Sequence, residues 1–561
     1  MHTAAIAFLR IASLIPLLAG AAGDGLPTVA DPNGPGGQLA GDPNAPTVNL
    51  IVRDSYLPGV PVLVRVEIAG PNGVVDRDVW DANAVLSVSG NPTIRLSTSR
   101  LALYNGLGSA LVTFTGSGDF DLTASVAQSP SAGQSNPSPP GAGVPPGMAK
   151  TATLLDWTGQ PVQTASGILR QSQTWSGVYH VTRGDFTIPA GVTLTLKPGT
   201  LVLIDGVASG TDGTDIDVQG SIQSLGTAAS PITFTAYAAG RNWGELHFAA
   251  AKPSMFRYTE IMRAGRSPGV GHTGTGPAIR ASNSALTFDH ASLTDHAGKI
   301  MDASSGTELI FTSTLFTRSA MGPEIAGTSL LFEDGWIIDI RNKDDADGIY
   351  VHSQLPKQTC TFLGSVIAGT DDDGIDTLGS DMVVEDSIIR GCKDKAVSVF
   401  DGQTTLRHCL LAGNNLAPED PTIASIAAKS FEGGTAIVNL DHTTIIASQY
   451  AGRIDAGLQS HNKYGVKKGT IIYNVTNSIV DATEPVSVQA PYLKSDIHVS
   501  YCDLIGTTWP GIGNLIADPQ FIDAQHSDYR LRDTSPCLGK ASPDSLLRDI
   551  GYYQSAAKPI R

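Results

Sequence analysis

The sequence predicts an all-β protein whose larger part is a solenoid of parallel strands. A short apolar motif recurs through the second half of the chain with a basal period of about 22 residues, which is typical of a repeat architecture. Within the motif, apolar residues alternate with polar ones, and an alternation of two is the period of a strand rather than of a helix. The 61 glycines and 34 prolines among 561 residues supply the many turns that such a chain needs.

Residues 1–23 have the features of a secretory signal. Arg10 stands near the start, an apolar run occupies residues 11–18, and small residues follow at 19–23. The apolar run is too short to span a bilayer. Residues 24–46 are rich in Gly, Pro, Asp and Asn and predict a flexible leader. We therefore expect a secreted or cell-surface protein, extracellular or periplasmic, with no membrane span.

Residues 47–127 predict a small antiparallel β-sandwich. Short alternating apolar runs are separated here by turns such as Pro71-Asn72-Gly73. This spacing over about 80 residues is similar to that of bacterial immunoglobulin-like domains. Residues 128–150 form a tract rich in Gln, Ser, Pro and Gly, and we expect them to act as a linker. Residues 151–561 are assigned to the solenoid and its C-terminal cap.

The solenoid repeat follows the pattern apolar, any, apolar, two polar, small, any, apolar. The small residues of successive motifs lie 23, 21, 30, 22, 22, 34 and 35 residues apart. The longer intervals contain inserts rich in Gly, Pro and Asp. Helical repeats do not have this spacing, and no leucine-rich register recurs, so a parallel β-helix remains. Eight copies of the motif place the small residue at Ala291, Thr314, Gly335, Ser365, Ser387, Cys409, Thr443 and Ser478.

Both ends of the repeat region resemble known β-helices. Residues 175–181 and 188–200 resemble the entry coils of bacterial right-handed parallel β-helices, and residues 517–523 with 528–531 resemble the closing stretch of secreted bacterial members. The resemblance implies a right-handed parallel β-helix with a C-terminal cap. It identifies an architecture and not a reaction.

The five cysteines form neither a disulfide framework nor a zinc site by their pattern, since the count is odd and no Cys-x-x-Cys occurs. Cys360 and Cys409 fall on apolar or small positions of the repeat. We expect both to be buried packing residues of the solenoid.

The charge balance limits the partners. Asp and Glu number 53 against 37 Lys and Arg, which gives a formal net charge of −16. Nucleic acids and anionic membranes bind to basic surfaces, so we expect neither as a partner. We expect a monomer, and the acidic balance favours cation binding.

Two aspartate-rich segments are the strongest functional signal. Residues 344–350 and 371–376 share an Asp-Gly-Ile core and together hold seven carboxylates. Aligning the coils on the apolar pattern places four residues in one inward column, Ile349, Ile375, Val397 and Ile426. Alternation then sends to one outward face Tyr350, His352, Asp376, Ser398, Phe400 and Lys429.

Carboxylates this close require a counter-ion, because adjacent rungs lie only about 4.8 Å apart. Ca²⁺ accepts six to eight oxygens in irregular geometry and suits this set. Zn²⁺ fits worse, since only His352 offers a nitrogen. The expected Ca²⁺ ligands are Asp347, Asp372, Asp373 and Asp376.

The same residues resemble a known family. Asp372-Asp373-Gly374-Ile375-Asp376, with Asp347-Gly348 one coil earlier, is similar to the calcium site of family 9 pectate lyases, and Ala427-Ala428-Lys429 echoes another stretch of that family. The resemblance implies Ca²⁺-dependent β-elimination on an acidic uronate polysaccharide, with a neutral lysine as base. The base maps onto either Lys395 or Lys429. An ordinary lysine is neutral at pH 7 only about once in 2,000, so its pKa has to be lowered or the pH has to be alkaline.

Other readings stay open at this point. A polygalacturonase-like glycoside hydrolase also uses paired aspartates, and His352 and Lys395 are then candidates for gripping the substrate. Tyr350, His352 and Phe400 are the candidate substrate-binding residues, although Tyr350 and Phe400 equally fit as covers of the core. A non-catalytic carbohydrate-binding or adhesive surface protein with a structural Ca²⁺ is a further alternative. In the last alternative, the aspartates only cap turns and have no functional role.

Overall fold

The computed structural model describes residues 46–128, 148–343, 345–416, 424–447, 456–488 and 494–555. The expected secretory signal, all but the last residue of the expected leader, most of the expected linker and Asp344 lie outside these residues. The described regular elements are strands, apart from one short 3-10 helix, η1, at Ala524–His526. The all-β prediction is therefore confirmed. No described helix is long and apolar enough to cross a membrane.

The first part of the described chain is a set of mainly antiparallel strands around a core of its own. Val64, Phe114 and Leu122 are among its fully buried side chains. The strands follow the order β1-β3-β7-β6-β4-β8-β9-β2, with β5 on β7. The immunoglobulin-like assignment of this part stays a prediction. Its strands are β1 Thr47–Ile51, β2 Ser55–Tyr56, β3 Pro61–Ala69, β4 Asp81–Ser89, β5 Arg95–Leu96, β6 Arg100–Tyr104, β7 Leu107–Thr115, β8 Phe120–Gln128 and β9 Ala149–Asp156.

The end of this first part differs from the sequence prediction. β9 pairs antiparallel with β8, from Phe120 opposite Leu154 to Ser125 opposite Ala149. Residues 151–156 therefore complete the first sheet and do not begin the β-helix. Without β9, the backbone N–H and C=O groups at one edge of β8 would have no strand to pair with. The chain returns along this edge and pairs with them before the β-helix begins.

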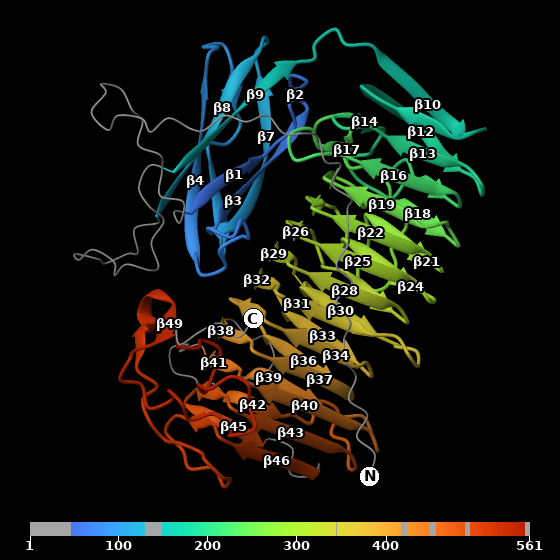
Figure 1. The fold of residues 1–561 in the computed structure, drawn as a ribbon. Coiled ribbons are helices and arrows are strands. Elements are labelled where there is room, and N and C mark those ends of the chain that lie inside the picture. The colour runs from blue at the N-terminus through green and yellow to red at the C-terminus, as the bar shows by residue number, and fades with distance from the viewer. Residues whose placement is uncertain are drawn as a thin grey trace, which may run out of the picture. The chain divides into compact units, whose positions relative to one another are not determined.

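The second part is a right-handed parallel β-helix with three ladders of parallel strands (Figure 1). It begins with β10, Val162–Ile168, which pairs with the long strand β12. The first ladder contains β12 Val178–Ile188, β14 Leu201–Ile204, β17 Ile232–Ala236, β20 Thr259–Met262, β23 Ser292–Thr294, β26 Leu315–Thr317, β29 Trp336–Ile340, β32 Val366–Thr370, β35 Ile388–Arg390, β38 Leu410–Asn414, β41 Thr444–Ala447, β44 Ile479–Asp481 and β47 Asp503–Leu504.

The other two ladders run beside the first through the same coils. The second contains β15 Ile216–Val218, β18 Leu246–Ala249, β21 Ile279–Ser282, β24 Met301–Ser304, β27 Glu324–Ala326, β30 Ile349–His352, β33 Ile375–Leu378, β36 Val397–Phe400, β39 Ala424–Lys429, β42 Ala456–Ser460 and β45 Glu484–Val488. The third contains β11 Gln173–Trp175, β13 Thr193–Leu196, β16 Ser221–Leu225, β19 Ser254–Arg257, β22 Ala285–Asp289, β25 Glu308–Thr312, β28 Ser329–Glu333, β31 Cys360–Leu363, β34 Met382–Glu385, β37 Gly402–Arg407, β40 Thr435–Asp441, β43 Thr470–Thr476 and β46 Lys494–Ser500.

The interior of the β-helix is a stack of like side chains, as the repeat predicts. Phe288 stacks between Phe256 and Phe311 with ring centroids 4.8 Å apart on both sides. Cys360 and Cys409 are buried in the same core, and all five cysteines are free thiols. The expected packing role of these two cysteines is confirmed.

The closing segment packs against the last coils. It contains the hairpin of β48, Phe521–Asp523, and β49, Asp528–Leu531. Cys537 and Ile550 are fully buried against Ile479 of β44. This contact covers apolar surface of the final coils, as expected of a cap.

The first sheet contacts the first ladder of the β-helix. Trp336 of β29 donates its indole N–H to the Tyr104 carbonyl at 3.0 Å. Arg390 of β35 donates to Asn105 Oδ1 at 2.6 Å and pairs with Asp81 at 2.8 Å. The candidate site described next belongs to the second ladder.

Candidate functional site

The rungs that carry the candidate site have the register that the sequence predicts. Ile349 pairs with Ile375, Ile375 with Val397, and Val397 with Ile426, and all four side chains are buried. The predicted inward column is thus confirmed. One outward column of the same strands passes through Glu324, Tyr350, Asp376, Ser398 and Ala427.

Steric crowding explains why each Asp-Gly-Ile core has a glycine at its centre. A Cβ built on Gly348 would lie 2.4 Å from the Gly374 carbonyl oxygen, and one on Gly374 would lie 2.7 Å from the Ala396 carbonyl oxygen. Coils approach too closely there for any side chain. The aspartates before these glycines are therefore held at the entrance to β30 and β33 by backbone packing.

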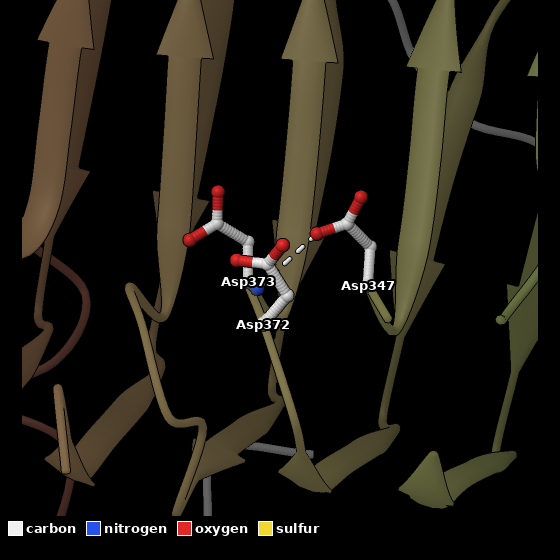
Figure 2. A group of neighbouring side chains, drawn as sticks. All are labelled: Asp347, Asp372 and Asp373. Carbon is white, nitrogen blue, oxygen red and sulfur yellow. Dashed lines mark hydrogen bonds between the residues drawn. The ribbon is translucent and has the colours of Figure 1, made fainter. Parts of the chain in front are cut away.

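Three aspartates converge between neighbouring coils. Asp372 and Asp373 precede β33, and Asp347 precedes β30 on the coil before (Figure 2). Each offers one carboxylate oxygen, and these oxygens lie within 4.8 Å of one another. The Asp373 N–H donates to Asp347 Oδ1 at 3.1 Å, which ties the two coils together. Asp347 and Asp373 are each only 5% exposed.

Burial and mutual repulsion perturb these acids. Burial, and then the charges of Asp376 and Asp373, raise the pKa of Asp347 well above its ordinary value. Burial, and then Asp373 and Asp394, raise the pKa of Asp372 to about 7, against a smaller opposing effect of Lys395. A cation between the carboxylates would remove this repulsion.

The three-aspartate group fits a calcium ion. Two oxygens bound at 2.3–2.6 Å to one ion lie at most about 5 Å apart, and the three aspartate oxygens, all within 4.8 Å of one another, satisfy that limit. All the donors are carboxylate oxygens, and no His or Cys belongs to the group, so the donor set is not that of a zinc site. Backbone and substrate oxygens would have to complete the shell.

Asp376 does not belong to that group, although the sequence predicted it as a fourth ligand. Burial, and then the charge of Asp373, raise its pKa to about 6, while Lys429 and a hydrogen bond with Ser398 act in the opposite direction. It follows Asp373 by three residues and starts the outward face of β33. Its charge acts on the pKa of Asp347, and the charge of Lys429 acts on its own pKa, so its carboxyl group lies near both residues.

Lys429 faces this carboxyl group from two rungs away. It ends β39, opposite Phe400, and its Nζ donates to Ser398 Oγ at 3.0 Å. Ser398 in turn pairs with Asp376 in the ladder. Lys429 is 5% exposed, and this hydrogen bond is to a neutral hydroxyl.

Lys395 has the contacts of a buried structural cation. Its Nζ pairs with Asp373 Oδ1 at 3.1 Å and also with Asp394, while its backbone N–H donates to Asp373 Oδ1 at 2.8 Å. Burial opposes the charge, but Asp373 and Asp394 outweigh it and raise the pKa of Lys395 above its ordinary value. A lysine held protonated in this way is a poor base, which argues against the predicted catalytic role of Lys395.

Tyr350 and His352 lie beside Glu324, an ionised carboxylate that the sequence pattern did not indicate. The His352 ring stacks on Tyr350 at 4.9 Å, and its Nε2 lies 3.3 Å from Glu324 Oε1. Burial raises the pKa of Glu324, but hydrogen bonds from His352 and Lys299 outweigh this and hold it at about 2. Glu324 and Lys299 stand outside the aspartate segments. The one signal that could have placed Glu324 beside Tyr350 is the pairing of the two residues in the outward column of the ladder.

Phe400 is not available to a ligand directly, contrary to the expectation for a substrate-binding residue. It is 8% exposed and stacks under Phe431 with ring centroids 3.9 Å apart. Tyr464 lies beside it at 5.6 Å. The exposed aromatic rings at this position come from two loops that the repeat pattern does not include.

Comparisons with known proteins give no family. No family model matches the chain, and a search of curated proteins finds no match. Among solved structures, a double mutant of the periplasmic alginate epimerase AlgG has a TM-score of 0.35 at 8% identity, over 60% of this chain and 78% of that one. A thermostable GH87 alpha-1,3-glucanase from Streptomyces thermodiastaticus has a TM-score of 0.34 at 12% identity, over 84% and 91%. Likeness at these scores carries no argument about what this chain does.

The raised pKa values predict a pH-dependent stability. The folded protein holds protons on Asp347, Asp372 and Asp376 that the unfolded chain releases near pH 4. The free energy of unfolding of the calcium-free protein should therefore fall as pH rises from about 4 to about 7. Added Ca²⁺ should raise the melting temperature more at about pH 8 than at about pH 5.

Thermal unfolding with EDTA or with Ca²⁺ at both pH values tests this prediction. The double variant Asp372→Asn, Asp376→Asn separates the site from other titrating groups, because it should lose much of the pH dependence. Equal slopes for the wild type and this variant would contradict the assignment.

Proposed function

We propose that this protein is a secreted Ca²⁺-dependent lyase that cleaves an acidic, uronate-containing polysaccharide by β-elimination. The observation that carries the proposal is the placement of Asp347, Asp372 and Asp373 on two coils, with Lys429 on the same ladder two rungs beyond. A cation site and a lysine on one face are the two parts that this elimination requires.

Each residue has a distinct part in the proposed reaction. Asp347, Asp372 and Asp373 would hold Ca²⁺, which supplies Lewis acidity to the substrate carboxylate when bound. Lys429 in its neutral form takes the proton from C5 of the uronate. The electron pair of that C–H bond forms the C4–C5 double bond, and the C4–O bond to the leaving sugar breaks. The leaving oxygen takes up a proton from solvent water, and the ammonium group of Lys429 returns its proton to solvent, so atoms and charge balance.

The contacts of the two lysines support Lys429 as the base. Lys395 is paired with two carboxylates and is kept protonated. Lys429 instead donates to the hydroxyl of Ser398, a neutral group that stabilises its charge less. Asp376 interacts with Lys429 through its charge, and in this proposal it orients the ammonium group between turnovers.

Calcium calorimetry together with a lyase assay tests the proposal. Purified protein is titrated with Ca²⁺ and then mixed with polygalacturonate or alginate, and the ultraviolet absorbance of the unsaturated uronate product is followed. We expect Ca²⁺ binding and a rise in absorbance that EDTA abolishes. Asp373→Ala should lose both, whereas the exposed Asp533→Ala should lose neither.

The other outcomes identify the alternatives. Binding of Ca²⁺ with new reducing ends but no absorbance would replace the lyase by a hydrolase. Binding of Ca²⁺ and polymer with no cleavage would leave a carbohydrate-binding or adhesive protein. No Ca²⁺ binding by the wild type would overturn the proposal.

A further inference from the structure

Two loops on the second ladder present aromatic rings to solvent next to Lys429. One follows β39 and carries Phe431, and the other follows β42 and carries Tyr464. Phe431 is 45% exposed and Tyr464 60% exposed. Their rings are parallel within 1° at a centroid distance of 6.2 Å, and both rest on the buried ring of Phe400. We call these three residues the aromatic platform.

The two loops are tied to each other by the Glu432 side chain and by a backbone hydrogen bond. Glu432 Oε2 accepts hydrogen bonds from the N–H of Lys467 at 2.8 Å and of Lys468 at 3.4 Å. The Gly433 N–H donates to the Lys468 carbonyl at 2.7 Å. Asn462 closes the second loop through two bonds with Val466, of 2.8 and 2.9 Å. A platform held in this way is pre-organised, so a ligand would lose little affinity to loop ordering.

The charge around the platform is opposite to that of the whole protein. Lys463, Lys467 and Lys468 are exposed, and none forms an ion pair with a described residue. Residues 424–434 and 456–469 contain four lysines and one acid, Glu432, in a chain of net charge −16. This part of the second ladder is therefore suited to an anion, although the protein as a whole is not.

The platform adjoins the candidate site through the strand register. Phe400 pairs directly with Lys429 and lies two residues beyond Ser398 on β36. Rungs of a ladder are about 4.8 Å apart, a spacing that lets a sugar chain contact both places at once. A ligand on the platform would be continuous with a ligand at Asp376 and Lys429.

We propose that the aromatic platform and its three lysines bind uronate sugars of an anionic polysaccharide beside the site of cleavage. This inference builds on the proposed function, but it makes a separate claim about binding. The exposed faces of Phe431 and Tyr464 pack against the apolar face of a pyranose ring, while the lysines pair with carboxylates on its edge. Neutral sugar polymers lack the second interaction.

Affinity electrophoresis of the full chain in EDTA tests the platform, because the calcium site then cannot hold the polymer. Gels contain polygalacturonate, alginate or neutral dextran. We expect retardation by the two uronate polymers and not by dextran, and a weakening of retardation with added salt. The double variant Phe431→Ala, Tyr464→Ala and the triple variant Lys463→Ser, Lys467→Ser, Lys468→Ser should each bind roughly tenfold more weakly.

Controls separate this inference from the proposed function. Tyr237→Ala removes an exposed ring far along the chain and Lys357→Ser an exposed lysine, and both should bind as the wild type does. Asp373→Ala should lose cleavage but keep the retardation. Loss of retardation in Asp373→Ala, equal retardation by dextran, or wild-type retardation of both platform variants would overturn the inference. So would stronger binding to phosphatidylserine vesicles than to either uronate polymer.

Discussion

Replacing Lys429 by alanine should lower the rate of uronate cleavage by roughly 10²- to 10⁴-fold, the usual loss when a general base is removed. The substitution deletes the amine that donates to Ser398 and whose charge lowers the pKa of Asp376. The proposed Ca²⁺ ligands precede β30 and β33 and are not changed. Calcium affinity by calorimetry should therefore stay within about twofold of the wild type.

Lys429→Arg distinguishes a base from a fixed charge. Arginine keeps the positive charge beside Asp376, but its guanidinium group is not deprotonated in proteins. We expect this variant to be as inactive as the alanine variant. Lys393→Ala serves as the matched control, since Lys393 is a half-exposed lysine that pairs with Asp371 at a neighbouring turn. Full activity in Lys429→Arg would show that a charge, and not proton abstraction, is what Lys429 provides.

Replacing Lys395 by methionine should destabilise the calcium-free protein by about 3–5 kcal/mol, the cost of leaving a buried charge without its partner. The lysine side chain is 2% exposed, and its removal leaves Asp373 and Asp394 next to the other aspartates without this cation. The free energy of unfolding from urea denaturation at about pH 8 measures the effect. Ca²⁺ should restore part of it.

The neighbouring lysine gives the control for this loss of stability. Lys393 has a side chain that is 45% exposed and forms an ion pair with Asp371 at the surface. Lys393→Met should cost no more than about 1 kcal/mol, as surface ion pairs generally do. If the two methionine variants were equally stable, Lys395 would not be the structural cation that its contacts indicate, and its candidacy as the base would have to be reopened.

The sequence predicted the parts of the site that depend on backbone periodicity. Ile349, Ile375, Val397 and Ile426 form one column because alternation along a strand leaves only one register with apolar residues inside. That register brings Asp347 close to Asp372 and Asp373. The convergence of these three aspartates followed from repeat spacing alone.

The sequence did not predict the features of the site that depend on the direction of a side chain or on inserts outside the repeat. Lys395 lies just before β36 and Lys429 ends β39. Only the direction of each side chain shows that the first reaches two carboxylates and the second a hydroxyl. Phe431 and Tyr464 lie in segments outside the repeat, so no periodicity placed them over Phe400. The pairing of β9 with β8 was missed because the two strands are separated by the expected linker.

The two longest repeat intervals have a consequence for how such a protein can change. They span 34 and 35 residues, from Cys409 to Thr443 and from Thr443 to Ser478, and they contain the loops of Phe431 and Tyr464. Extra residues between rungs leave the ladder pairing intact, as β36, β39 and β42 remain in register. The residues of these loops can therefore change without changing the residues on which the folding of the coils depends. Grafting residues 430–434 together with 461–469 onto the corresponding turns of another β-helix, with a phenylalanine at the position of Phe400, should transfer the proposed binding of anionic sugars.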